Sequence, residues 1–202
     1  MAVLNMVTAV SRPQNLMRIF RSIRSTIREC TLPVKWIMVF DSPNNTPEDF
    51  QKIIDKVTFM KIQKAYWPNG PMKFGIPQKN LGMDLCEEGF FHLLDDDNLV
   101  HPNFLKRISQ LVKAHPDKLA FAFNQRRWDQ VNDLRARPES MYPGQIDNTM
   151  FVVHTSLIGS RRYDFKHAGY EDGMFFMELF RSAPEAFVFV DEFLAYYNFL
   201  RR

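Results

Sequence analysis

Residues 90–104 read FFHLLDDDNLVHPNF, and this stretch decides how the rest of the chain is interpreted. The apolar run over residues 90–94 predicts a buried strand, which ends directly in three aspartates at positions 95–97. Pro102 then opens a predicted helix. Three adjacent carboxylates repel one another, and no basic residue close in the sequence balances them. Such a run is either a solvated turn or a cation site.

The composition describes an ordinary globular chain. Its 202 residues predict one domain that can bury a substantial core, and 19 phenylalanines indicate a well-filled one. The formal net charge of +3 can help to attract a phosphorylated ligand. It is far from the basic surface of a nucleic-acid-binding protein, so no nucleic-acid partner is expected.

The cysteines and the two ends of the chain bear on its location. Cys30 and Cys86 are isolated in the sequence and predict reduced thiols in a cytoplasmic compartment. The apolar residues 2–10 follow no basic segment and predict a strand, not a signal peptide, and no run reaches membrane-spanning length. The abrupt end, YYNFLRR, is compatible with one domain of a longer polypeptide.

Strands and helices alternate over the first 127 residues. Near-continuously apolar strands are predicted at residues 2–10, 34–40, 58–66, 90–94 and 118–127, and helices follow the first four. This alternation predicts an α/β fold with a mostly parallel sheet that helices cover on both faces. The first helix also carries arginines on a second stripe, which we interpret as a solvated outer face. These arginines are Arg18, Arg21, Arg24 and Arg28.

The last third of the chain follows a different pattern. Residues 126–148 are polar and contain Pro138, Pro143 and Gly144, which predicts a loop or lid. A strand at 149–154, a helix at 170–182, and one long or two short strands at 186–198 follow.

Several polar residues are expected at one edge of the sheet. In open α/β sheets, ligands bind beyond the carboxyl ends of the strands. The segment Thr8–Arg12, Asp41, and the aspartates at 95–97 all follow such ends, so we expect them to converge on one crevice. Asp95 and Asp97 offer a carboxylate pair of the kind that binds Mg²⁺ or Mn²⁺ together with substrate phosphates.

Five features in order give the chain a family resemblance. They are TAVSRP after the first strand, VFDS at the end of the second, PQKNLG at a helix start, LLDDDNLVHPNF, and YEDGMF. The set resembles the GT-A superfamily of nucleotide-sugar glycosyltransferases, especially its family-2-like members, over residues 3–175. In size and layout the chain is most similar to a small glycosyltransferase domain of large chlorella viruses.

The resemblance implies a single GT-A-like (Rossmann-like) domain with Mn²⁺ or Mg²⁺ as cofactor. Residues 1–100 would form its nucleotide-binding half, and residues 101–202 its acceptor and catalytic half. It would move a hexose from a UDP-linked donor, such as UDP-glucose or UDP-rhamnose, to the hydroxyl of a glycan or glycoprotein.

The resemblance also implies roles for individual residues. Asp97, with Asp95, would hold the metal, and Asp172, with Glu171 as second candidate, would be the catalytic carboxylate. Lys79 stands where the family usually has arginine, which loses bidentate phosphate geometry. The residues implied to bind the nucleotide-sugar are Thr8, Val10, Arg12, Asp41, Lys79, Asn80, Asp95 and Asp96.

Simpler interpretations stay open for several of these residues. Glu171 and Asp172 also suit the first turn of a helix, and Asp41 also suits a turn. His154 and His167 are possible metal ligands, although lone histidines are more often packed or solvated. Three aromatic side chains could stack on a sugar but equally could be packed: Trp67, Trp128 and Tyr142. Arg126 and Arg127 could reach the diphosphate but equally could be exposed.

Two other classes of function are compatible with strand-end aspartates. One is a metal-dependent phosphohydrolase, for which the sequence lacks a convincing nucleophilic aspartate with its partner lysine or second acidic cluster. The other is a non-catalytic module that binds a nucleotide or carbohydrate.

Overall fold

The apolar run before the three aspartates is a central strand of an eight-stranded sheet. The computed structural model describes residues 2–42, 46–69, 75–127 and 133–200. The strand order across the sheet is β3-β2-β1-β4-β7-β6-β8-β5. In chain order these strands are β1 (Val3–Val10), β2 (Val34–Phe40), β3 (Lys61–Tyr66), β4 (Gly89–Leu93), β5 (Leu99–Val100), β6 (Ala120–Arg127), β7 (Phe151–His154) and β8 (Phe187–Tyr197).

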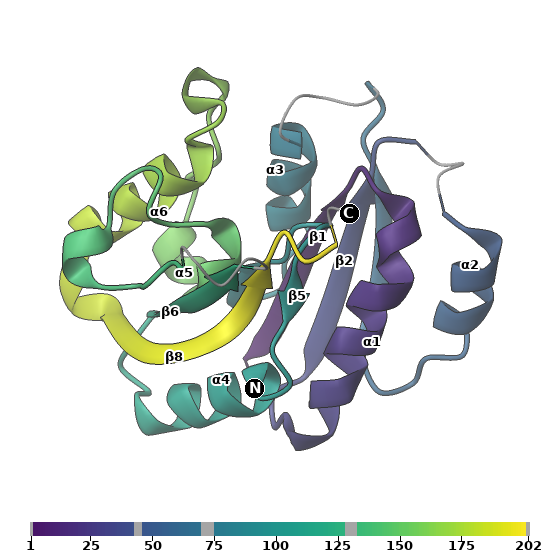
Figure 1. Cartoon of the computed structure of the whole chain (residues 1–202), viewed down its shortest axis with the longest axis horizontal. Coiled ribbons are helices and arrows are strands. Elements are labelled where there is room, and N and C mark those ends of the chain that lie inside the picture. Colours follow the sequence, from purple (N-terminus) through teal and green to yellow (C-terminus); the bar gives the residue numbers. More distant parts are fainter. Residues whose placement is uncertain (1, 43–45, 70–74, 128–132, 201–202) are drawn as a thin grey trace.

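The two halves of the sheet are built differently. Strands β1 to β4 are mutually parallel, with β1 between β2 and β4. Strand β6 does not pair with β4 as a fifth parallel strand, because β7 lies between them and is antiparallel to both. The long β8 pairs in parallel with β6, with shifts of register near Asn124, and curves around that half of the sheet (Figure 1). The short β5 was not predicted and closes the far edge.

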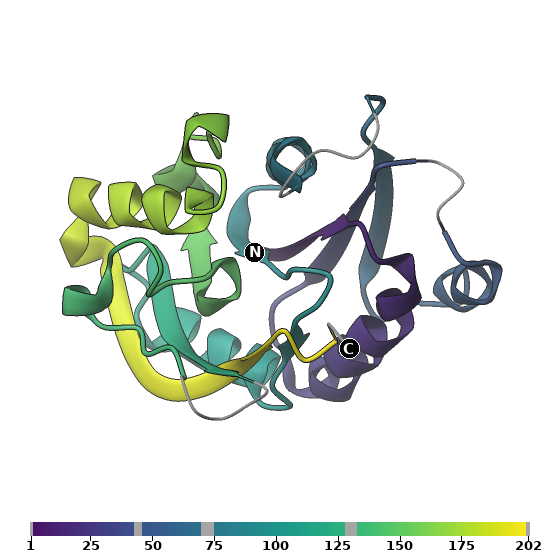
Figure 2. The same cartoon turned by 45° about the horizontal axis from the view of Figure 1, so that its top comes forward.

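In the described part of the chain, three helices cover each face of the sheet. The apolar sides of α1, α2 and α4 belong to one buried cluster, and those of α3, α5 and α6 belong to the other. Figure 2 shows the sheet between these layers. None of the helices in the described ranges is long and apolar enough to cross a membrane. The helices are α1 (Leu16–Thr26), α2 (Glu48–Ile54), α3 (Ile76–Asp84), α4 (Phe104–Ala114), α5 (Thr155–Ile158) and α6 (Glu171–Ser182).

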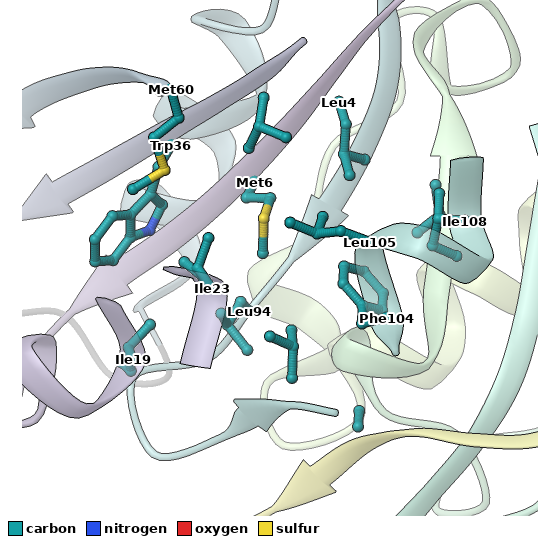
Figure 3. Packing of buried hydrophobic residues seen from close by; sticks show 14 of the residues in the cluster. Leu4, Met6, Ile19, Ile23, Trp36, Met60, Leu94, Phe104, Leu105 and Ile108 are labelled. Carbon is teal, nitrogen blue, oxygen red and sulfur yellow. The ribbon is translucent and has the colours of Figure 1, made fainter. Parts of the chain in front are cut away.

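Alternating side chains of the strands feed the two clusters. In β1, Leu4 and Met6 face α1 and α4, whereas Val7 faces α3. Figure 3 shows the first cluster, in which Trp36 and Ile23 pack beside Met6. All of these side chains except Met6 and Trp36 are aliphatic, and all are fully buried. Burial of a side chain of this size contributes about 1.5–3 kcal/mol, so these layers fix the strand ends that the site uses.

Helix α3 lies unusually close to β1. A Cβ added to Gly82 would stand 2.2 Å from a methyl carbon of Val7, so only glycine fits at this crossing. Gly75, the residue before α3, has a φ of 63°. This left-handed conformation favours glycine and starts the helix at the edge of the crevice. The predicted helix from Pro77 is therefore confirmed, with its first residue at Ile76.

Candidate functional site

A cavity of about 540 Å³ lies beyond the carboxyl ends of β1, β2 and β4. The amino-terminal ends of α3 and α6, the loop before β7 and the end of β8 complete its wall. Its lining residues are Ala9, Val10, Ser11, Arg12, Asp41, Gly75, Gln78, Lys79, Asp95, Asp96, Asp97, Asp147, Gly169, Glu171, Asp172, Tyr197 and Asn198.

Asp96 organises the turn between β1 and α1. One carboxylate oxygen accepts hydrogen bonds from the backbone N–H groups of Ser11 and Arg12, both at 2.6 Å, and from the Ser11 hydroxyl. The other oxygen meets the Arg12 guanidinium at 2.5 Å. The same guanidinium lies 3.4 Å from Asp97. These contacts fix Arg12, whose side chain is 36% exposed, at the cavity wall.

Three carboxylates meet deeper in the cavity. Asp95, Asp147 and Asp172 each offer an oxygen, and these oxygens lie within 4.8 Å of one another. Asp147 is held by the side-chain amide of Gln125 at 2.8 Å and the backbone N–H of Thr149 at 3.0 Å, both donating to Oδ1. The group therefore joins the end of β4, the loop before β7 and the start of α6.

Lys79 is the counter-ion of the acidic end of α6. Its ammonium lies 3.1 Å from both Glu171 and Asp172, and its side chain is only 6% exposed. Glu171 also accepts a hydrogen bond from the Gly169 backbone at 2.6 Å, which fixes the turn before the helix. Burial lowers the pKa of Lys79, but the carboxylates of Asp172, Asp95 and Glu171 together raise it by more than burial lowers it. The pKa is therefore above its usual value, and the lysine is charged.

The carboxylates of the cluster are harder to ionise than free aspartates. Burial raises the pKa of Asp95 well above its usual value, with Asp147 and Asp172 adding to the effect against Lys79. Burial and the neighbouring Asp172 raise the pKa of Asp147 to about 6. The pKa of Asp172 is also raised, mainly by burial, although Lys79 opposes this. A cation bound among these groups would favour their ionised forms.

Asp147 makes the stability of the metal-free protein depend on pH. Its folded-state pKa of about 6 exceeds that of an unfolded aspartate. The contribution of protonated Asp147 to the free energy of unfolding is therefore fully present below the pKa of the unfolded state, and it is lost as the pH rises through about 6. We expect Asp147→Asn to gain stability relative to the unmodified protein by about 2 kcal/mol between pH 4 and pH 7. Urea unfolding of chelator-treated protein measures this difference, and a value that does not change with pH would contradict it.

Most of the residues predicted to form the site line the cavity. They are Val10, Arg12, Asp41, Lys79, Asp95, Asp96, Asp97, Glu171 and Asp172. Thr8 and Asn80 are not part of its wall. Thr8 is fully buried and accepts a hydrogen bond from the Trp36 indole, and the Asn80 side chain makes two hydrogen bonds with the backbone of Tyr163.

The described residues for which the sequence left both a binding role and a packing role open do not line the cavity. His154 bonds to Ser156 at the start of α5, and His167 lines two other hollows. Arg126 stacks on Phe193. Arg127, Trp67 and Tyr142 do not line the cavity either. Trp128 lies outside the described residues.

Sequence reasoning missed Asp147 and Gln78. Asp147 caps the short 3-10 helix Asn148–Met150, and the sequence Asp-Asn-Thr after Ile146 is a signal that could have indicated a fixed turn. Gln78 follows the predicted start of α3 by one residue. Its buried Oε1 at the cavity has no hydrogen-bond partner among the described residues. A bound ligand can satisfy that oxygen.

The donor set of the cavity fits a hard divalent cation. Asp95, Asp147 and Asp172 bring carboxylate oxygens together, and any two of them can supply the ligands that Mg²⁺ and Mn²⁺ prefer. Asp97 adds another carboxylate to the wall, beside Arg12. Three clustered carboxylates with raised pKa values and a single neighbouring lysine leave a net negative charge that a cation can balance.

The comparisons with known proteins concern the fold. No protein-family model matches the chain, and no curated protein matches its sequence. Its structure resembles TarS from S. aureus at a TM-score of 0.69 and 13% identity, over 96% of this chain and 36% of that one. It also resembles residues 1–349 of TarS in complex with UDP-GlcNAc, at a TM-score of 0.65 and 14% identity, over 96% and 58%.

A third similar structure is the mannosyltransferase PcManGT from Pyrobaculum calidifontis in complex with GDP-Man and Mn²⁺. Its TM-score is 0.68 at 13% identity, over 96% of this chain and 56% of that one. The chain thus spans between about one third and three fifths of the length of these proteins. At such identities the likeness establishes the fold, which is the GT-A-like α/β fold predicted from the sequence.

Proposed function

We propose that the protein is a metal-dependent glycosyltransferase of the family-2-like type. It transfers a hexose from a UDP-linked donor, such as UDP-glucose or UDP-rhamnose, to the hydroxyl of a glycan or glycoprotein. The observation that carries the proposal is the group of Asp95, Asp147 and Asp172 beside a buried lysine, in a cavity at the strand ends. The fold adds support, since similar structures hold UDP-GlcNAc, or GDP-Man with Mn²⁺.

The first part of the proposal concerns the donor. Asp41, at the end of β2, accepts hydrogen bonds from the nucleoside, and Arg12 attracts the diphosphate. Asp95 holds the cation together with Asp97, as the resemblance implies, or with Asp147, which the structure brings near. When bound, Mn²⁺ or Mg²⁺ neutralises the negative charge that develops on the departing diphosphate.

The second part concerns the acceptor. Asp172 takes the proton of the acceptor hydroxyl, or stabilises the positive charge that develops on the sugar. Its side chain is 22% exposed at the cavity, whereas that of Glu171 is 5% exposed. Glu171 instead positions Lys79 and the turn before α6. A raised pKa suits Asp172 for accepting a proton near neutral pH.

The test is a thermal-shift series with UDP-glucose, UDP-rhamnose, UDP-GlcNAc and GDP-mannose, each with and without Mn²⁺. We expect a UDP-sugar to stabilise the protein only when Mn²⁺ is present, by about 2.7 kcal/mol at 100-fold excess over its Kd. Equal stabilisation with and without metal would overturn the cation assignment. Donor binding without any release of UDP when glycan acceptors are added would indicate a non-catalytic module. Release of UMP and sugar 1-phosphate would indicate a phosphohydrolase.

Isosteric variants identify the cation ligands. Asp95→Asn should remove the dependence on Mn²⁺. Asp97→Asn and Asp147→Asn, made in parallel, show which carboxylate is the second cation ligand. The variant that lacks a ligand should lose the Mn²⁺ dependence of donor binding, and the other variant should keep it. If all three variants keep the dependence, the cation lies elsewhere.

A further inference from the structure

Helix α1 presents a row of arginines that the proposed function does not use. Arg18, Arg21, Arg24 and Arg28 are all exposed and lie on the outer side of the helix and of the short 3-10 helix that continues it. At 1.5 Å per residue, the row is about 15 Å long. The opposite side of α1 is buried against the sheet. The row therefore faces solvent. Helix α1 itself lies beside α2 (Figure 1).

These arginines differ from several other basic residues on the surface in having no acidic partner among the described residues. Lys52, Lys61, Lys106 and Arg107 each lie within 4 Å of an acidic partner. None of the four arginines has such a partner within the described ranges, and α1 itself contains no acidic residue. Four adjacent positive charges without counter-ions repel one another, and an anionic surface would relieve this repulsion.

The row also borders an apolar hollow. A space of about 500 Å³ is lined by Arg21, Arg24, Arg28, Ser25, Ile27 and Phe59. Phe59 is 41% exposed, which is unusual for a phenylalanine. Arginines around an aromatic and an aliphatic side chain combine positive charge with apolar area. This combination is typical of surfaces that lie on a lipid interface.

We propose that this face of α1 docks the protein onto a membrane surface rich in anionic lipids. The arginines would contact the headgroup phosphates, and Phe59 with Ile27 would enter the interface between headgroups and acyl chains. A nucleic acid fits this surface less well, because Phe59 is the one aromatic ring among the described residues lining the hollow on which a base can stack, and Ile27 adds aliphatic area that suits acyl chains. The cavity is lined by Arg12, which precedes α1, whereas the hollow is lined by Arg21, Arg24 and Arg28 further along the helix, so docking through the hollow would leave the cavity accessible. This inference goes beyond the proposed transfer reaction and does not depend on it.

The test is co-sedimentation of the full chain with vesicles of phosphatidylcholine alone or with about one third phosphatidylglycerol. We expect binding only to the anionic vesicles, falling as salt increases. Each arginine near an anionic surface contributes about five-fold in affinity, so Arg21→Gln/Arg24→Gln should weaken binding about 25-fold. Glutamine retains the helix propensity of arginine, so the fold should be kept.

A matched control removes the same charge elsewhere. Lys166 and Arg181 are exposed, lie on the opposite layer and form no ion pair in the described part of the chain. Lys166→Gln/Arg181→Gln should bind vesicles nearly as well as the unmodified protein, whereas Phe59→Ser should weaken binding even at high salt. Equal losses in the two double variants, or equal binding to neutral vesicles, would overturn the proposal. So would tight binding of a single-stranded oligonucleotide without binding of vesicles, which would make the row a nucleic-acid site.

Discussion

Asp172→Asn should lower the rate of sugar transfer by a factor of about 10²–10⁴ and leave the affinity for the donor nearly unchanged. The reason is that a carboxylate near the reacting hydroxyl matters mainly in the transition state. The substitution keeps the shape of the side chain, and its amide oxygen can still accept a hydrogen bond from Lys79, 3.1 Å away in the unmodified protein. The measurement is UDP release under saturating donor, together with donor affinity from calorimetry.

Glu171→Gln is the matched control for this prediction. Glu171 is nearly buried and its two oxygens already accept from Lys79 and from the Gly169 backbone. The Glu171→Gln substitution should therefore lower the stability of the fold more than it lowers the rate of sugar transfer. If the two variants exchange behaviour, Glu171 is the catalytic carboxylate. If neither loses more than a few-fold in rate, the reacting group lies outside this pair. Inversion of the sugar, seen by NMR of the product, would further support Asp172 as a base.

The parallel half of the fold could be predicted because its signals are local. Residues 34–40 are all buried in β2, and all of them except Lys35 are apolar, which is the pattern that a strand between two helical layers requires. The other half could not be predicted in the same way. Strand β7 lies between β4 and β6 because of pairings with residues far away in sequence, such as Phe91 with Val153 and Phe121 with Val152. Hydrophobic periodicity gives no information on which strands become neighbours.

The site was predictable where it follows directly from a strand end. Asp41 and the aspartates at 95–97 reach one cavity because parallel strands end at the same edge. Their individual environments were not predictable. Asp96 is directed at the turn before α1, whereas Asp95 is directed at Asp147 and Asp172. Asp147 comes from an irregular loop, in which no periodic pattern indicates the direction of a side chain.

Lys79→Met should lower the free energy of unfolding by about 3–5 kcal/mol at pH 7, because it leaves buried carboxylates without their counter-ion. The lysine contacts Glu171 and Asp172, and Asp95 adds to its electrostatic stabilisation. The loss should shrink as the pH falls, since protonation of the carboxylates removes the uncompensated charge. Denaturant unfolding of chelator-treated protein at pH 7 and pH 5 measures both effects.

Two further variants make the result specific to the buried charges. In Lys79→Met/Asp172→Asn one carboxylate is removed with the lysine, so part of the lost stability should return. Lys61→Met removes an exposed lysine that lies 2.6 Å from Glu87, and it should change stability little because solvent screens that pair. If Lys79→Met were as mild as Lys61→Met, the carboxylates around Lys79 would already be neutral at pH 7. A neutral cluster would in turn be a poor site for a divalent cation, so this stability measurement also tests the charge on which the proposed donor chemistry depends.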